Sequence, residues 1–266
     1  MTDTMLASTA TDSLPSARDA RRRESHAERR QTGHALTRSA VLLGAALFAT
    51  GCTSGSGTAI APLPGSGGTF DEDCPIGADT VTEGRVIRDQ AFDAYVDPEA
   101  NGIGEDLRQS VSICDFYNPT GDGVFEDDSP FAGRPKPRAL LVNVSAVWCQ
   151  PCKLEASEIL PEEYELYGPQ GLEILMVLAD SQAQGVAADF EDLEAWVTAF
   201  EVHYIGSVDQ DRSFTNQFNS GQFPSNVLVD TSTLEVVRNI TGLPGEAFFG
   251  QLEQLLEEPV VVEEDP

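Results

Sequence analysis

The chain has 266 residues and a formal net charge of −28, and 41% of its residues are hydrophobic. That apolar share is sufficient for a packed core, so the composition excludes wholesale disorder. Residues 1–51 hold seven arginines and five acidic residues, which leaves nine basic and 39 acidic residues from Cys52 onward. Such an acidic body repels nucleic acid and anionic lipid, so we expect no nucleic-acid partner.

Residues 1–51 have the features of an export signal. Their arginines precede an apolar stretch at 40–49, which is far shorter than the roughly 20 residues that a membrane-spanning helix requires. The stretch ends at Ala49-Thr50-Gly51-Cys52, which resembles a bacterial lipobox, although most lipoboxes have Leu where Ala49 stands. We therefore expect an exported protein with a lipid on Cys52 that anchors it to a membrane. An ordinary signal peptide with cleavage nearby is the alternative.

The next two segments lead to the main domain. Residues 52–72, rich in Gly, Ser and Pro, predict a flexible linker, and residues 73–138 predict an N-terminal extension with candidate strands at 81–86 and 110–116. Of the five cysteines, Cys52 is the lipidation candidate, and Cys149 and Cys152 lie close together in one motif. Cys74 and Cys114 remain as a pair, which favours a structural disulfide between them in an oxidising compartment. Its loop of about 40 residues would restrict the unfolded chain by roughly 3–4 kcal/mol. A third redox thiol is the alternative.

Two acidic stretches of the extension, 97–102 and 122–128, contain the oxygen ligands that Ca²⁺ prefers. The first begins like an EF-hand loop, but its twelfth position is Arg108, where a bidentate Glu is required. We therefore interpret both stretches as solvated acidic loops and expect no metal site.

The apolar run 139–144 predicts a buried strand, and it leads to Trp148-Cys149-Gln150-Pro151-Cys152-Lys153. A polar pattern suited to a helix begins there, with Pro151 tolerated in the first turn. Unpaired N–H groups and the helix dipole favour an anion at such a position, so Cys149 is expected to be thiolate-prone. The spacing lets Cys152 close a disulfide with it and predicts a redox centre.

Three other interpretations of the two cysteines have less support. Zinc needs a second pair of Cys or His ligands, and His203 is the only histidine after the leader. A purely structural disulfide in so small a loop removes little chain entropy. A peroxiredoxin would need a Thr three residues before its reactive cysteine, and that position is Ala146.

The remaining segments predict alternating helices and strands. A helix over 153–166 should kink at Pro161, because proline removes a backbone donor and clashes with the preceding turn. Trp196 lies on an apolar helix face and is expected in the core. The later strands are expected at 172–180, 202–208, 226–229 and 234–239, and the later helices at 190–200, 212–218 and 243–256. These elements form a core domain, 139–258, which is followed by an acidic tail, 259–266.

The motif at 148–153 resembles the W-C-x-P-C-K active site of the thioredoxin superfamily. Glu155 stands where the membrane-tethered TlpA/ResA-like branch has a glutamate, and Asn143 replaces an acidic residue of thioredoxin itself. Pro224, preceded by Phe223, stands where the superfamily carries a cis-proline against the disulfide. The resemblance covers roughly residues 110–257. It implies an α/β, thioredoxin-like fold with a mixed central sheet, flanking helices and an N-terminal extension.

The resemblance also implies a function, without a cofactor. The implied function is that of an extracytoplasmic thiol-disulfide oxidoreductase. Such a protein reduces the disulfide of a client protein, such as an apocytochrome c, and takes the electrons from a membrane electron-donor protein. Cys149, at the exposed helix start, would be the nucleophile and Cys152 the resolving thiol. Glu155 would tune a thiol pKa or be a surface carboxylate, Pro224 would shape the client groove, and Trp148 would limit access. The alternatives are a thiol-oxidising disulfide donor and a non-enzymatic lipoprotein binding module.

Overall fold

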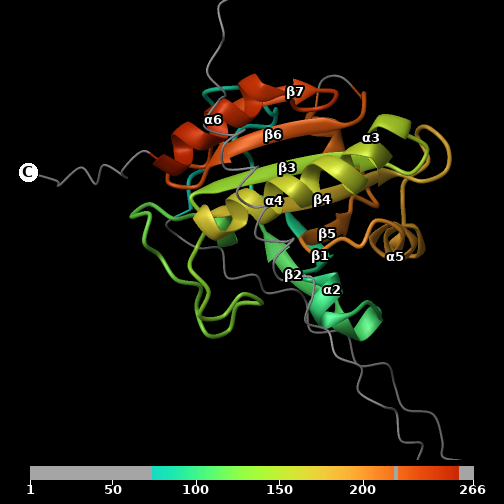
Figure 1. The fold of residues 1–266 in the computed structure, drawn as a ribbon, viewed down its shortest axis with the longest axis horizontal. Coiled ribbons are helices and arrows are strands. Elements are labelled where there is room, and N and C mark those ends of the chain that lie inside the picture. The colour runs from blue at the N-terminus through green and yellow to red at the C-terminus, as the bar shows by residue number, and fades with distance from the viewer. Residues whose placement is uncertain (1–73, 219–220, 258–266) are drawn as a thin grey trace, which may run out of the picture. The chain divides into compact units, whose positions relative to one another are not determined.

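The computed structural model describes residues 74–218 and 221–257 (Figure 1). The predicted leader 1–51, the lipidation candidate Cys52, the linker 52–72 and the acidic tail 259–266 lie outside the described residues. These assignments stay predictions. Within the described residues, no helix combines the length and the apolar character that crossing a membrane requires.

The described chain forms a seven-stranded mixed sheet in the order β2-β1-β5-β4-β3-β6-β7 (Figure 1). The three central strands, β5, β4 and β3, are parallel, and the strands added on either side pair in antiparallel fashion. The strands are Ala91–Tyr95 (β1), Gln109–Ser112 (β2), Ala139–Ala146 (β3), Leu172–Asp180 (β4), Ile205–Val208 (β5), Ser225–Asp230 (β6) and Glu235–Thr241 (β7). The expected fold class, α/β with a mixed sheet, is confirmed.

Strands β3 and β4 form the centre of the sheet, and every residue of both is buried. Strands that are covered on both faces need apolar side chains on both, which explains their continuous apolar runs. The strands predicted at 139–144 and 172–180 are confirmed. β3 extends two residues beyond its prediction, because Ser145 and Ala146 still pair with β4.

The two faces of the sheet are covered by different parts of the chain. Alternate residues of a strand point to opposite faces, and Leu141 packs with the helices whereas Leu140 packs with the extension. The helical face carries α4 (Leu160–Tyr167), α5 (Phe190–Ala199) and α6 (Glu246–Glu257), with α4 across β3 and β4 in Figure 1. The other face is covered by a cluster of aromatic rings from the extension: Phe116, Phe125 and Phe131.

The strands predicted in the extension are wrong in extent. β2 covers only the start of the predicted 110–116 strand, because the chain turns into a short 3₁₀ helix, Cys114–Phe116. β1 was not predicted, since five residues with Asp93 at their centre give only a weak alternation. In the supposed acidic loop 97–102 the chain forms a short helix, α2 (Pro98–Asn101), and the carboxylate of Asp97 caps it by accepting from a backbone N–H at 3.0 Å.

The predicted strand 81–86 is not a strand of the described sheet. Residues 84–87, which we call the strap, lie beside β7 instead, and Val86 forms an isolated β-bridge with Glu235. The strap runs along the outer side of β7. The N–H of Gly84 donates to the carbonyl of Val236 at 2.8 Å, and the N–H of Val236 donates to the carbonyl of Arg85 at 2.9 Å. The N–H of Ile87 donates to the carbonyl of Leu234, also at 2.9 Å. The strap therefore provides hydrogen-bond partners to β7 on the side away from β6.

The helix after the cysteines changes its winding at its middle. Helix α3 (Gln150–Leu154) passes through a π-helical segment, Glu155–Ile159, into α4. The N–H of Leu160 donates to the carbonyl of Glu155, five residues back. Pro161 has no N–H, and its ring would clash with a carbonyl four residues earlier, so a wider turn before it accommodates the ring. The irregularity predicted at Pro161 thus takes the form of a π-helical turn.

The later elements agree with the predictions in type and differ at their ends. The β6–β7 hairpin and α5 are confirmed, and Trp196 is buried. β5 is shorter than predicted, and the helix predicted at 212–218 is a 3₁₀ turn, Thr215–Gln217. α6 begins at Glu246 instead of 243, because Pro244 disfavours the helical conformation for the residue before it.

Candidate functional site

The cysteine pair lies where β3 ends and α3 begins. Cys149 is the N-cap residue of α3, and it forms a disulfide with Cys152, with the two Cα atoms 5.3 Å apart. The backbone N–H of Cys152 donates to Sγ of Cys149 at 3.2 Å. In the reduced state the same N–H and the positive end of the helix dipole would stabilise a thiolate on Cys149.

Both sulfur-bearing residues are buried in the oxidised state. Cys149 is 2% exposed and Cys152 0%. The expectation that Cys149 lies at an exposed helix start is therefore wrong. The turn from β3 into α3 places Cys149 in the core of the helical face, against which Phe223 also packs.

Trp148 and Pro224 lie on two loops that meet beside the disulfide. The Phe223–Pro224 peptide bond is cis. The ring of Phe223 meets the indole of Trp148 edge to face, with centroids 6.0 Å apart. The carbonyl of Pro224 accepts from the N–H of Gly242 at 2.8 Å, which ties this loop to the end of β7. Trp148 is 37% exposed, so it offers apolar surface next to the buried cysteines.

Glu155, one turn beyond Cys152, is fully buried, so its interpretation as a surface carboxylate is wrong. Oε2 accepts from the side-chain amide of Asn143 and Oε1 from that of Asn226, both at 2.7 Å. Burial raises the pKa of Glu155 to about 7, because desolvation of the carboxylate outweighs the two amide hydrogen bonds that lower it. The group can therefore gain or lose a proton near neutral pH.

The amides that hold Glu155 belong to a larger buried network. Asn143 also donates to Oδ1 of Asn226 at 2.9 Å and accepts from the hydroxyl of Ser145 at 2.8 Å. Asn226 also donates to the carbonyl of Gly242 at 3.2 Å. Sequence reasoning singled out Asn143 only as a departure from thioredoxin, and it missed Asn226. The signal available in the sequence was the amide side chain of Asn226, which stands in an otherwise apolar strand two residues after Pro224.

The second cysteine pair lies in the extension. In the structure Cys74 and Cys114 are joined by a disulfide, with their Cα atoms 5.9 Å apart. The backbone N–H of Cys114 donates to Oδ1 of Asp89 at 3.0 Å. Across residues 74–218 and 221–257, no group of three or more His, Cys, Asp or Glu side chains lies close enough together to hold a metal ion.

The sheet order, the cis-proline and the disulfide at the start of the helix after the central strand define a class: a thioredoxin-like fold that carries a cysteine pair. No protein-family model matches the chain, and no curated protein matches it.

Several solved structures are similar to this chain. A provisionally assigned thiol:disulfide interchange protein, DsbE, from Chlorobium tepidum is 16% identical, with a TM-score of 0.47, over 66% of this chain and 99% of that one. The thioredoxin domain of a thiol-disulfide oxidoreductase from Bacteroides vulgatus is 17% identical, with a TM-score of 0.45, over 67% and 100%. A thiol:disulfide interchange protein from a Bacteroides species is 18% identical, with a TM-score of 0.42, over 70% and 92%. Similarity at this level says nothing about substrate or partner.

Proposed function

We propose that the protein is a thiol-disulfide oxidoreductase whose Cys149–Cys152 dithiol reduces disulfides of client proteins. The observation that supports it best is the placement of this disulfide at the N-terminus of α3, one helical turn from a buried carboxylate. A structural bridge would need neither a thiolate-stabilising helix end nor a group that titrates near pH 7. The cis-proline loop beside it supplies a surface on which a client chain can lie.

In the first step, the thiolate of Cys149 attacks one sulfur of the client disulfide. A bond forms between Sγ of Cys149 and that sulfur, the client disulfide breaks, and the second client sulfur leaves as a thiolate that takes up a proton. The N–H of Cys152 already points at Sγ of Cys149, so it stabilises the attacking thiolate.

In the second step, Cys152 attacks Sγ of Cys149, and the bond between Cys149 and the first client sulfur breaks. That client sulfur leaves as a thiolate and takes up a proton. Cys152 must lose its proton to attack, and ionised Glu155 is the buried base one turn away that accepts it. The two electrons of the dithiol have then passed to the client, which leaves with two thiols, and the Cys149–Cys152 disulfide is formed again. A new cycle requires a dithiol donor.

We assign this reaction to the outside of the cytoplasm, on the strength of the export signal and lipobox read in the sequence. The lipid on Cys52 would anchor the domain to a membrane, and a membrane protein would return electrons to the dithiol. Apocytochrome c, whose haem-binding cysteines must be reduced, is the client class that the sequence resemblance suggests. The same resemblance favours reduction over oxidation of clients.

The test is a redox titration of the purified protein in glutathione buffers, with the thiols counted at each potential. A reduction potential near that of thioredoxin, about −270 mV, is expected for a reductase. A value near about −120 mV would replace this function with that of a disulfide donor. If a Cys149→Ser, Cys152→Ser variant titrated like the wild type, the redox role would be wrong and a binding module would be the better assignment. Cys74→Ser, Cys114→Ser is the matched control.

A further inference from the structure

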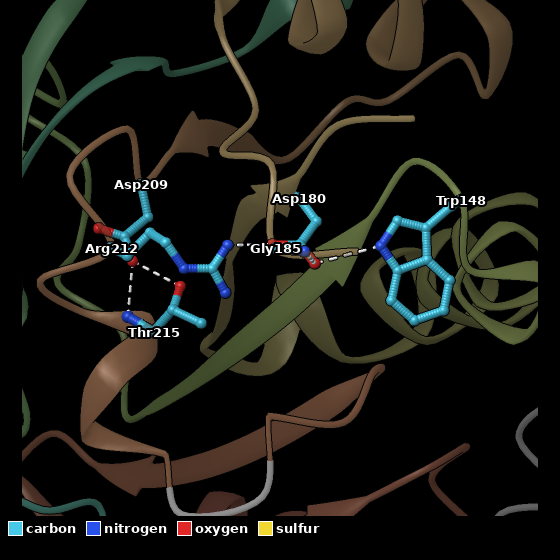
Figure 2. A network of polar contacts seen from close by, with 6 residues as sticks. All are labelled: Trp148, Asp180, Gly185, Asp209, Arg212 and Thr215. Carbon is cyan, nitrogen blue, oxygen red and sulfur yellow. Dashed lines mark hydrogen bonds and ion pairs between the residues drawn. The ribbon is translucent and has the colours of Figure 1, made fainter. Parts of the chain in front are cut away.

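Asp180, the last residue of β4, is a fully buried carboxylate that joins three segments. Its Oδ2 accepts from the indole N–H of Trp148 at 3.1 Å and from the backbone N–H of Gly185 at 2.8 Å. Its Oδ1 is paired with the guanidinium of Arg212. Figure 2 shows this carboxylate between Arg212 on one side and Trp148 on the other.

Arg212 approaches Asp180 from a turn with fixed geometry. Its backbone has a φ of 60°, in the left-handed region, and its N–H donates to the carbonyl of Asp209 at 3.0 Å. The carboxylate of Asp209 is itself buried and accepts from the backbone N–H and the hydroxyl of Thr215 (Figure 2). A buried carboxylate such as Asp180 is costly without a paired cation, and Arg212 supplies that charge.

The groups on the other side of Asp180 are apolar and exposed. Trp148 is 37% exposed, and Val186, which follows Gly185 in the chain, is 54% exposed. Because Trp148 and Gly185 donate to the same oxygen, the Asp180 carboxylate joins the segment of Gly185 to that of Trp148, which precedes Cys149 in the chain. We call Trp148 and Val186 the apolar rim.

We propose that Arg212 is a positioning residue, which acts through Asp180 to hold the apolar rim in place for the apolar chain that flanks a client disulfide. This role rests on the dithiol reaction proposed above. It implies that the protein selects clients with apolar residues next to the disulfide. The side chain of Arg212 pairs with Asp180, and its backbone hydrogen-bonds to Asp209 and Asn216, so its effect is on client binding and not on electron transfer. A small disulfide that is too short to reach the rim reacts equally well with and without Arg212.

The test mixes pre-reduced full-length protein with excess disulfide and measures the single-turnover rate against disulfide concentration. The probes are a synthetic peptide whose disulfide is flanked by leucines, and oxidised glutathione. Arg212→Gln raises the half-saturating peptide concentration roughly tenfold, which corresponds to about 1.4 kcal/mol, and leaves the glutathione rate within about twofold of wild type. Arg238→Gln, which removes a surface ion pair with Glu83, changes neither.

A double-mutant cycle separates positioning from general loosening. If Arg212 acts in part through the indole, Arg212→Gln causes a smaller loss of peptide binding in the Trp148→Phe background than in the wild type. Multiplied losses in the double variant, or an equal loss with glutathione, overturn the proposal. The indole ¹H–¹⁵N resonance of Trp148 is a second readout: it shifts in Arg212→Gln, and an unchanged resonance contradicts the proposed link.

A double variant in which both charges are removed serves as the control for effects on folding. In Asp180→Asn, Arg212→Gln the new amide keeps one oxygen for Trp148 and Gly185, and its nitrogen donates to the glutamine oxygen. This variant binds peptide like the wild type, whereas Asp180→Ala, Arg212→Gln does not; equal binding by the two overturns the role of Asp180. Turnover of the peptide disulfide by the wild type tests the proposed function. The ratios of half-saturating peptide concentration between variants and wild type test the role of Arg212.

Discussion

At the scale of single residues, Glu155 lies one helical turn beyond Cys152 and is buried between the side-chain amides of Asn143 and Asn226. Its pKa of about 7 lies above the ordinary 4.5 of a glutamate because desolvation outweighs the amide hydrogen bonds. The raised pKa affects both the stability of the protein and the chemistry of the cysteine pair.

The stability of the oxidised protein should fall as pH rises through the range in which Glu155 ionises. Between pH 4.5 and about 7 the folded state holds a proton that the unfolded state has lost, so this contribution is present below pH 4.5 and lost above pH 7. From about pH 5 to about pH 8, the free energy of unfolding should fall about 2 kcal/mol more in wild type than in Glu155→Gln. Urea unfolding at both pH values measures it, and parallel curves would contradict the shifted pKa.

The same substitution should slow the second step of the proposed dithiol reaction. Without a base to accept the proton of Cys152, Glu155→Gln should resolve the mixed disulfide on Cys149 about 100-fold more slowly near pH 8. Acid quenching and chromatography measure the amount of mixed disulfide over time. Glu158→Gln is the matched control, since Glu158 is exposed on the same π-helical segment; an equal effect there would count against a specific base.

At the scale of elements, local signals and distant contacts specify different parts of the fold. β3, β4, α5 and the β6–β7 hairpin were predictable, because long apolar runs, helical spacing and a turn signal are local. β1 and the strap beside β7 depend on partners far along the chain. The burial of Glu155 is of this kind too, since Asn226, which fixes it, lies 71 residues away. The cysteine motif was recognisable; the network beneath it was not.

Helix α5 offers a test of local capping. Its N-cap, Asp189, accepts from the N–H of Asp192 at 3.0 Å, and the side chain of Asp192 accepts from the N–H of Asp189 at 3.3 Å. Asp189→Ala should lower the free energy of unfolding by about 1 kcal/mol, because the N–H of Asp192 loses its side-chain partner. Denaturant titration measures the change. Glu191→Ala, in the same turn but exposed, should cost clearly less.

At the scale of the whole molecule, the extension is part of the domain, because it covers one face of the sheet with its own aromatic cluster. The Cys74–Cys114 disulfide closes a separation of 40 residues within that part of the chain. Cys74→Ser, Cys114→Ser should therefore lower the free energy of unfolding by roughly 3–4 kcal/mol. The measurement is denaturant unfolding of the oxidised proteins, and a loss below about 1 kcal/mol would indicate that the pair is not a structural bridge.

The strap at 84–87 has a consequence for how these molecules behave in a crowd. A bare edge strand is a template on which another chain can add a strand, and proteins that lack protection there tend to self-associate. Because the strap already occupies both backbone hydrogen-bonding groups of Val236 on the outer side of β7, the first part of that edge is closed to strand addition. Copies of the protein at high concentration are thus hindered from pairing with one another along this part of β7.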